Sequence, residues 1–282
     1  MTNLTKEQYE YIEKKVTVTA HEAWKGRPIF GSDILPPMGE GVQVYTDYLE
    51  TEMSDAVVDP NFVDNDEDMI NLVEANYITE VVQKSFVIKR RNKKASERTG
   101  IPLSTTAAQA ASRVVAKKED AMLLNGVSFD GGTTYPIEGL FQKAGQTDAT
   151  TQDFGTAGKA IQATGTGIQK MSSQGVEGPY DWVLYPTQWG QLKASRLSNG
   201  KSEWEEVLGM LEGGNIYMSS SMPTDDGLMC ASSGRGYYQY ALCADLTVEF
   251  KERENGDTKG KVFAIGVPVI KEVNAVCTMT GI

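Results

Sequence analysis

One stretch of the chain, Pro102 to Gly126, constrains the fold most, because it has the pattern of a long amphipathic helix. Ser104 can cap its start just after Pro102, and Asn125-Gly126 can end it. At about 1.5 Å per residue, its roughly twenty residues make a rod near 30 Å long. One face comprises Ala107, Ala108, Ala111, Val114, Val115 and Met122, and the opposite face comprises Gln109, Arg113, Lys117 and Asp120. We therefore predict a spine helix over 104–125 that packs on a sheet.

The length and composition are those of a globular protein with a sizeable core. With 282 residues, the chain can form one large domain or two smaller ones. The longest apolar run, Val262 to Ile270, is too short to span a membrane, and the N-terminus lacks the pattern of a signal peptide. Cys230, Cys243 and Cys277 lie far apart in the sequence, which favours buried, reduced thiols over disulfides. We expect no membrane partner.

The net charge of −11 is concentrated in one segment. Between Asp47 and Gln83 there are eleven acidic residues and neither Lys nor Arg, so the rest of the chain holds 38 − 11 = 27 acids against 27 bases. Residues 84–98, which follow immediately, carry seven bases and one acid. The basic run has a single aromatic residue, so contact with another protein is favoured over contact with nucleic acid.

The segments before the spine helix differ in character. Residues 4–15 have the pattern of a short helix. Residues 16–45 are rich in Gly and Pro, and we expect an extended arm that packs on a neighbouring subunit. Residues 46–83 favour two strands of a protruding acidic hairpin with a turn near Asp59-Pro60-Asn61; a solvated acidic loop is the alternative. Residues 85–91 favour a strand that leads into a basic hinge at 92–101.

The segments after the spine helix alternate helix and strand signals. A capping box formed by Ser202 and Glu205 predicts one helix start, and Asn255-Gly256 predicts a hairpin turn. We expect helices near 156–171, 186–192 and 202–211, and strands near 182–185, 215–219, 228–232, 237–242, 246–251 and 261–270. The pattern indicates an α+β architecture with mixed, mostly antiparallel sheets.

No constellation of residues argues for catalysis or for a cofactor. The only histidine, His21, lies in the arm, far from any cysteine in the sequence, so neither a nucleophilic triad nor a metal cluster is predicted. Gly158-Lys159 lacks the first Gly and the Ser or Thr of a phosphate-binding loop. The acidic cluster Asp64, Asp66, Glu67 and Asp68 lacks the Gly and the terminal Glu of a calcium loop, so a solvated acidic tip is the preferred interpretation.

Four segments, taken in order, resemble one family. They are Phe86–Gly100 leading into the spine helix with Glu119-Asp120 and Asn125-Gly126 near its end, then Ile137-Glu138-Gly139-Leu140, then Gly175-Val176-Glu177-Gly178-Pro179-Tyr180 before strand 182–185, and finally Gly213-Gly214-Asn215-Ile216 with Ala244-Asp245 further on. In these the chain resembles the encapsulins and, through them, the major capsid proteins of tailed viruses, which have the Hong Kong 97-type capsid fold. The resemblance runs from about residue 4 to the C-terminus.

The resemblance implies a division of the chain into parts. Residues 1–45 are expected to form the N-terminal arm and residues 46–83 the extended loop, an acidic hairpin that reaches over a neighbour. Residues 84–141 and 246–282 are expected to form the peripheral domain with the spine helix. Residues 142–245 are expected to form the axial domain that meets its copies at symmetry axes.

Charge and resemblance together suggest two sets of interface residues and a pore loop. The acidic set is Asp55, Asp59, Asp64, Asp66, Glu67 and Asp68. The basic set, expected on a strand, is Lys89, Arg90, Arg91, Lys93 and Lys94. The axial pore loop is Arg196, Leu197, Ser198, Asn199, Gly200 and Lys201. We expect the acidic set of one subunit to lie over the basic set of its neighbour. Residues 46–83 contain no lysine, so the lysine cross-link of some tailed-virus capsids is not expected here.

The function that the resemblance implies is structural. The leading expectation is a major capsid protein that self-assembles through pentamers and hexamers into an icosahedral viral head, a virion of a phage or archaeal virus assembled in the host cytoplasm. Such a head encloses DNA without binding it specifically, and scaffold, portal or decoration proteins are its further partners. The alternative is an encapsulin nanocompartment that encloses a cargo enzyme, and a third hypothesis is an enzyme or small-molecule binder on this fold.

Two departures from the encapsulin pattern favour the viral expectation. Encapsulins begin with a short amphipathic segment ahead of the part that matches residues 4–13, and this segment helps to hold cargo; the sequence starts without it. The acidic segment 46–83 is also longer than expected for an encapsulin.

Overall fold

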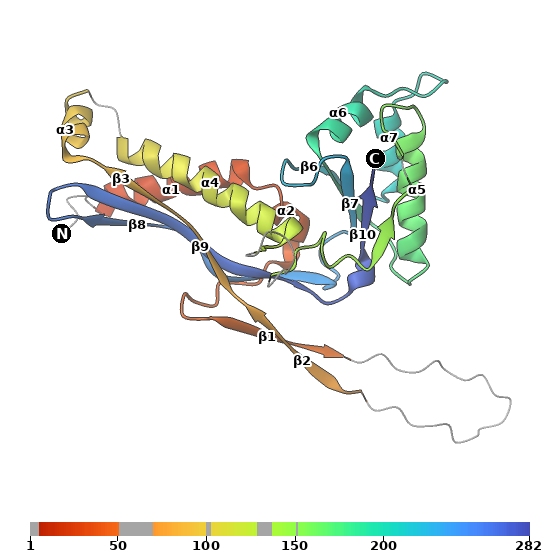
Figure 1. Ribbon diagram of the computed structural model, residues 1–282, viewed down its shortest axis with the longest axis horizontal. Coiled ribbons are helices and arrows are strands. Elements are labelled where there is room, and N and C mark those ends of the chain that lie inside the picture. Colours follow the sequence, from red (N-terminus) through yellow and green to blue (C-terminus); the bar gives the residue numbers. More distant parts are fainter. Residues whose placement is uncertain (1–5, 51–69, 100–102, 129–136, 151) are drawn as a thin grey trace.

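The computed structural model describes residues 6–50, 70–99, 103–128, 137–150 and 152–282. Figure 1 shows a long flat body, a compact lobe at one end of it, and a hairpin that projects from the body. The body is built from α1 (Lys6–Ala23), α2 (Arg27–Phe30), a 3-10 turn (Gly31–Asp33), β3 (Glu80–Ile88), α3 (Arg90–Thr99), α4 (Leu103–Asn125), β8 (Tyr238–Glu252) and β9 (Thr258–Ile270). The hairpin consists of β1 (Val44–Glu50) and β2 (Leu72–Ile78).

The lobe is built from β4 (Gln146–Asp148), α5 (Lys159–Ser172), β5 (Tyr180–Leu184), α6 (Pro186–Ala194), α7 (Glu203–Met210), β6 (Ile216–Met218), β7 (Asp226–Ala231), a second 3-10 turn (Val273–Ala275) and β10 (Val276–Thr280). This mixture of helices with mainly antiparallel sheets confirms the α+β class. Within the described ranges, none of the helices combines the length and the apolarity that a membrane crossing requires.

The body is organised on a three-stranded antiparallel sheet in the order β3-β9-β8. The predicted Asn255-Gly256 turn joins β8 to β9, and Gly256 has the positive φ of 77° that such a turn requires. The two strands expected at 237–242 and 246–251 are one continuous strand, β8. Register shifts between Leu242 and Thr247 absorb the interruption that the sequence pattern shows there.

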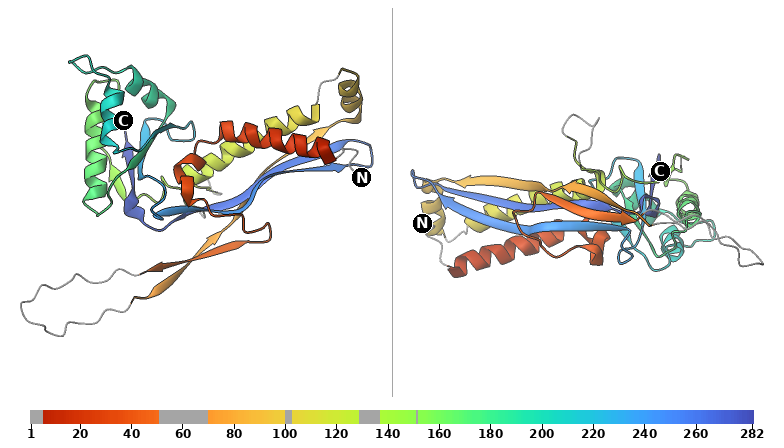
Figure 2. Two further views of the ribbon diagram at one scale, coloured as in Figure 1. Left: turned by 180° about the vertical axis from the view of Figure 1, so that it is seen from behind. Right: turned by 90° about the horizontal axis from the view of Figure 1, so that it is seen from below.

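The spine helix is confirmed as α4, and it covers one face of the sheet together with α1 (Figure 2). Its buried face differs from the predicted one: Val114 is 51% exposed, whereas Asp120 is only 3% exposed. The reason is that α4 contacts two surfaces, the sheet beneath it and α1 beside it. The buried face is therefore wider than a single stripe and turned away from Val114.

The expectation that residues 16–45 form an extended arm on a neighbouring subunit is wrong for their first part. α1 continues to Ala23, and its Val16 and Ala20 are buried in one cluster with Ala108, Ala111 and other side chains of α4. The small alanines in the first half of α4 allow a helix to approach closely, so the N-terminal segment packs on its own chain.

The lobe contains a mixed five-stranded sheet in the order β4-β10-β7-β5-β6. β10 pairs antiparallel with β7 and parallel with β4, which places residues 276–280 in the lobe and not with the rest of 246–282. Conversely, residues 238–245 belong to the body through β8. The expected boundary at 245/246 thus differs from the structure, because the chain passes between the two sheets before β8 and again after β9.

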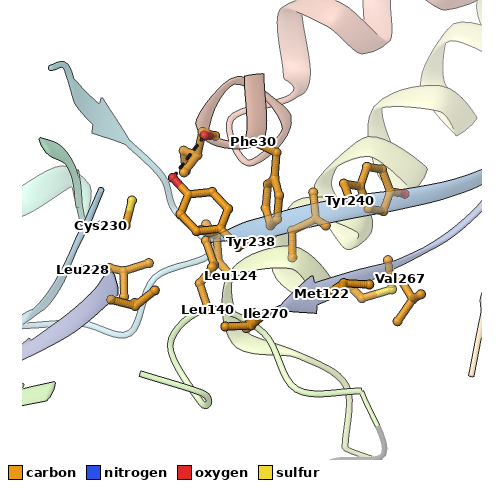
Figure 3. Packing of buried hydrophobic residues seen from close by; sticks show 14 of the residues in the cluster. Phe30, Met122, Leu124, Leu140, Leu228, Cys230, Tyr238, Tyr240, Val267 and Ile270 are labelled. Carbon is orange, nitrogen blue, oxygen red and sulfur yellow. Dashed lines mark hydrogen bonds between the residues drawn. The ribbon is translucent and has the colours of Figure 1, made fainter. Parts of the chain in front are cut away.

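One hydrophobic cluster joins the two sheets (Figure 3). Phe30 of α2 lies edge-on to Tyr238, with ring centroids 5.3 Å apart, and also contacts Tyr240. Leu228 of β7 and Leu124 of α4 belong to the same cluster. The body and the lobe therefore share a core and hold a fixed relative orientation.

Candidate assembly interface

The β1–β2 hairpin exposes a strip of apolar side chains. In its antiparallel register, Val44 lies opposite Ile78 and Tyr48 opposite Glu74, and these pairs share one face with Leu72. Val44, Tyr48, Leu72 and Ile78 are each between 48% and 61% exposed. A two-stranded ribbon is marginally stable alone, and apolar side chains on its open face favour contact with another protein. The predicted hairpin strands are thus confirmed.

The opposite face of the hairpin is anchored to the body. Asp47 forms an ion pair with Lys271, with 2.9 Å between Oδ2 and Nζ. Tyr45 and Tyr77 pack on the hydrophobic cluster that the body and the lobe share. Burial, followed by the nearby Asp47 carboxylate, raises the pKa of Tyr77. Thr79, between β2 and β3, donates its amide N–H to Gln43 O and its hydroxyl to Val42 O. The hairpin therefore leaves the body at Thr79, and not through a hinge at 92–101 as the sequence suggested.

The predicted acidic interface residues lie outside the described part of the chain. They are Asp55, Asp59, Asp64, Asp66, Glu67 and Asp68, all within 51–69 between the two hairpin strands, as is the expected turn at Asp59-Pro60-Asn61. By sequence, residues 51–69 carry seven acids and no base.

Four of the five residues of the predicted basic set lie on a helix and not on a strand, and Lys89 lies between the two elements. Strand β3 ends at Ile88, and Arg90, Arg91, Lys93 and Lys94 belong to α3. The Asp257 carboxylate, from the β8–β9 turn, accepts the amide N–H of Arg90 at 2.9 Å and so satisfies one free donor at the start of α3. The sequence pattern did not predict this helix, because α3 is mostly charged and has almost no apolar face.

The structure adds three basic residues that sequence reasoning missed. Lys251 and Lys259 lie opposite each other across β8 and β9, and Arg253 follows in the turn that packs against Arg90. All three are exposed. We use the name basic tip for Lys89, Arg90, Arg91, Lys93, Lys94, Lys251, Arg253 and Lys259. Over residues 89–94 and 251–259 these eight bases outnumber three acids, a local charge of 8 − 3 = +5. The predicted Asn255-Gly256 hairpin was the signal that could have brought them together.

The predicted pore loop projects from the lobe between α6 and α7 (Figure 1). Arg196 bridges Ser202 across its base, and Leu197 donates its amide N–H to Lys201 O at 3.0 Å. The guanidinium of Arg196 turns back onto the carbonyl oxygens of Lys193 and Ser195. Ser198, Asn199 and Gly200 are left exposed at the end of the loop.

The capping box predicted at the start of α7 does not form. Ser202 is the N-cap residue but makes no side-chain capping bond, and its hydroxyl instead accepts a hydrogen bond from Arg196 at 3.2 Å. The helix start is nevertheless where the pattern placed it.

A buried ion cluster fixes the N-terminal segment to the spine helix. Arg27 contacts Glu119 and Asp245 at 2.8 Å each, and its guanidinium lies 3.7 Å from the ring centroid of Trp24. Glu119 is fully buried and also accepts hydrogen bonds from Trp24 Nε1 at 2.9 Å and from the Tyr240 hydroxyl at 2.6 Å. The two oxygens of Glu119 therefore accept hydrogen bonds from α2, from the residue after α1 and from β8.

Asp120 completes the buried ion cluster through the main chain. Its carboxylate accepts the amide N–H groups of Lys25 and Gly26 at 2.7 and 2.8 Å. Burial raises the pKa of Asp120 to about 7, although the two N–H donors act in the opposite direction. The Glu119-Asp120 pair that contributed to the family resemblance thus holds residues 24–27 against α4.

The three cysteines are free and buried, as predicted. Burial raises the pKa of the Cys277 thiol to about 11, which keeps it protonated and unreactive at neutral pH. His21 falls within α1, but its side chain lies outside the described residues. The described residues contain no group of three or more His, Cys, Asp or Glu side chains able to hold a metal ion.

Solved structures of a virus-like particle and of several phage capsids share this fold. A virus-like particle from Pyrococcus furiosus superimposes with a TM-score of 0.65 at 15% identity, over 97% of this chain and 99% of that chain. The capsid of Myoviridae phage XM1 superimposes with a TM-score of 0.70 at 16% identity, over 89% of this chain and 90% of that chain. These likenesses confirm the Hong Kong 97-type capsid fold.

Sequence comparisons point to a particular family within this fold. The type 1 encapsulin shell protein EncA of Myxococcus xanthus is 26% identical over 281 residues, 99% of this chain and 94% of that protein. A diheme-cytochrome–encapsulin shell fusion protein of Kuenenia stuttgartiensis is 25% identical over 98% of this chain and 74% of its own length. The family model described as encapsulating protein for peroxidase matches residues 1–261. The chain therefore belongs to this family of encapsulating, shell-forming proteins.

Proposed function

We propose that this chain is the subunit of a closed encapsulin-type nanocompartment that encloses a protein cargo. The observation that carries the proposal is the whole-length similarity to the Myxococcus xanthus encapsulin shell protein, together with the family match over residues 1–261. Membership of the family makes the chain a structural protein. The cargo, an enzyme such as the peroxidase in the family's description, is the further step taken here.

The viral head has less support than this alternative, although the sequence departures favoured it. The sequence relatives at 25–26% identity are encapsulin shell proteins, whereas the phage capsids share 12–16% identity and support only the fold. Of the two departures, the longer acidic loop concerns residues 51–69, whose placement lies outside the described chain. The length of the segment between β1 and β2 bears on how neighbouring subunits are joined and does not decide what the shell contains.

The mechanism of assembly that we propose pairs the acidic segment 51–69 of one subunit with the basic tip of its neighbour. The acidic segment carries seven acids and no base, and the basic tip has a local charge of +5. Its cationic side chains are exposed or half-exposed, and α3 and the β8–β9 turn hold them on one end of the body. Charge pairing of this kind fixes register and suppresses wrong partners more than it adds affinity.

The apolar strip of the hairpin would add the affinity that the charges do not. The strip runs along the open face from Leu72, at the end of the hairpin that borders the acidic segment, past Tyr48 to Val44 and Ile78 at its base. A neighbour that lies along the hairpin would therefore meet the acids and also cover the strip. The loop 196–201 would then lie at the symmetry axis where copies of the lobe meet, with the lobe as axial domain and the body as peripheral domain.

Expression of the chain alone, followed by electron microscopy, tests this function. The expected result is closed shells of uniform diameter. Particles purified from the native source should then contain a stoichiometric protein cargo. Genome-length DNA protected from nuclease inside native particles would favour the viral head, and a monomer with no particles at any concentration would contradict both.

A further inference from the structure

Three helices of the lobe meet at the buried carboxylate of Glu203, which no part of the assembly mechanism above uses. Glu203 is the first residue of α7 and is completely buried. Its Oε2 accepts the hydroxyl of Ser195, the residue that ends α6, at 2.5 Å. Its Oε1 accepts the amide N–H of Ile161, in the first turn of α5, at 3.3 Å.

The Glu203 carboxylate is held by hydrogen-bond donors at helix ends and not by a cation. Within the part of the chain that the structure describes, Glu203 is in none of the ion pairs. It lies at the N-terminus of α7 and beside the N-terminus of α5, a helix of 14 residues whose N-cap, Gly158, has no side chain to supply a cap. The N-terminus of α5, with its positive partial charge and free N–H groups, therefore faces a carboxylate that the first residue of α7 carries.

Ser195 and Glu203 also flank the loop 196–201, with Ser202 between the loop and Glu203. Between them, Arg196 bridges Ser202, Leu197 donates to Lys201 O at 3.0 Å, and Gly200 donates to Leu197 O at 2.8 Å. Lys193, which precedes the loop, also links α6 to α7. Its Nζ lies 4.2 Å from the ring centroid of Trp189 in α6 and 4.7 Å from that of Trp204 in α7. The loop is thus closed on itself above a buried polar junction.

We propose that Glu203 is the positioning residue of the loop 196–201, and that it sets the loop's conformation in the free subunit, before assembly. The opening at the symmetry axis would then be a property of the subunit fold and not of contacts formed in the shell. The place of the loop at the axis rests on the proposed function, whereas the role of Glu203 does not.

Hydrogen exchange on unassembled subunits, read at single amides, tests the proposal. In the wild type, the amides of Leu197 and Gly200 should be protected. Glu203→Ala should speed their exchange at least about tenfold while the amides of β5 and β7 keep their protection, because the opening is local. Ser195→Ala should give a smaller increase at the same amides, and Glu205→Ala, on the exposed side of α7, should give none.

The isosteric variant Glu203→Gln keeps the experiment decisive if Glu203→Ala does not fold. It preserves shape and one acceptor oxygen but removes the charge between the helix ends, so it should accelerate the loop amides by an intermediate factor. The proposal is overturned if the loop amides are unprotected in the wild-type subunit, or if a variant speeds loop and sheet amides equally. Neither result depends on whether the chain closes into shells.

Discussion

The buried ion cluster and the basic tip both place cationic side chains near the spine helix, and the two regions neutralise them in opposite ways. In the buried ion cluster, Arg27 meets two carboxylates and an indole of its own chain, and Glu119 is fully buried. At the basic tip, eight cationic side chains gather around one hairpin turn with few acids beside them.

The contrast separates what folds the subunit from what joins subunits. A buried charge must find its partners within the chain, because an unpaired one costs several kcal/mol. An exposed cluster of like charges is destabilised only by repulsion among those charges, and a partner of opposite charge relieves that repulsion. The predictions below test this division, in order of decreasing free energy per subunit.

The largest effect should come from a charge placed beneath the spine helix. Val115 is 1% exposed and packs with Val16 and the sheet, so Val115→Asp should abolish folding. The adjacent Val114→Asp is the matched control, since Val114 is 51% exposed. Circular dichroism and solubility should show a folded Val114→Asp protein and an insoluble or unfolded Val115→Asp protein. A folded Val115→Asp subunit would mean that α4 is not part of the monomer core.

The next effect should come from removing the cation of the buried ion cluster. Arg27→Met leaves the Glu119 carboxylate buried with only its two neutral donors, and should cost roughly 3–5 kcal/mol of unfolding free energy. Arg113→Met, at an exposed position of the same spine helix, should cost less than about 0.5 kcal/mol. Urea unfolding measures both. Equal, small costs would show that the cluster contributes little to the fold.

A pH dependence should follow from Asp120. Its pKa is about 7 in the folded protein and near 3.8 when unfolded, so the folded state binds the proton more tightly. The contribution of Asp120 is therefore most favourable below about pH 4 and falls as the pH rises to about 7, by about 4 kcal/mol. Unfolding free energies of the wild type and Asp120→Asn, measured from pH 4 to 8, should diverge over this window and run parallel above it. Parallel curves throughout would contradict the raised pKa.

The smallest effect per subunit, but one repeated at every interface, should come from reversing the basic tip. Lys89→Glu, Arg90→Glu and Arg91→Glu together should block shell formation, because the acidic segment of the neighbour would then meet like charge. The subunit should stay folded, because exposed ion pairs contribute only about 0.2–1 kcal/mol each to its stability. Arg113→Glu, Lys117→Glu and Lys118→Glu on the exposed side of α4 give the same net charge, −11 − 6 = −17, and should still assemble. Size-exclusion chromatography compares the two. Normal shells from the first triple variant would refute the pairing.

Sequence patterns predicted the elements whose signals are local and failed where tertiary contacts decide. The C-terminal end of the spine helix, the hairpin strands and the Asn255-Gly256 turn follow from local signals in the sequence. The predicted N-terminal cap does not form, because α4 begins at Leu103 and Ser104 lies inside the helix. The burial of Asp120 could not be foreseen, because its partners are the main-chain N–H groups of Lys25 and Gly26, some 95 residues away.

Only the part of the candidate interface that depends on local sequence could be predicted. The charge step between 46–83 and 84–98 is visible in the sequence, whereas Lys251, Arg253 and Lys259 join the basic tip only through the pairing of β8 with β9 and the contact of Asp257 with Arg90. The helical form of α3 was missed because its residues carry charge on every side and no apolar stripe.

Cryo-electron microscopy of shells formed by the chain expressed alone tests the central claim most directly. The account predicts density for residues 51–69 of each subunit against α3 and the β8–β9 turn of its neighbour, with Val44, Tyr48, Leu72 and Ile78 covered by the same contact. Closed shells in which residues 51–69 point into solvent, or in which the basic tip faces no acidic segment, would contradict it.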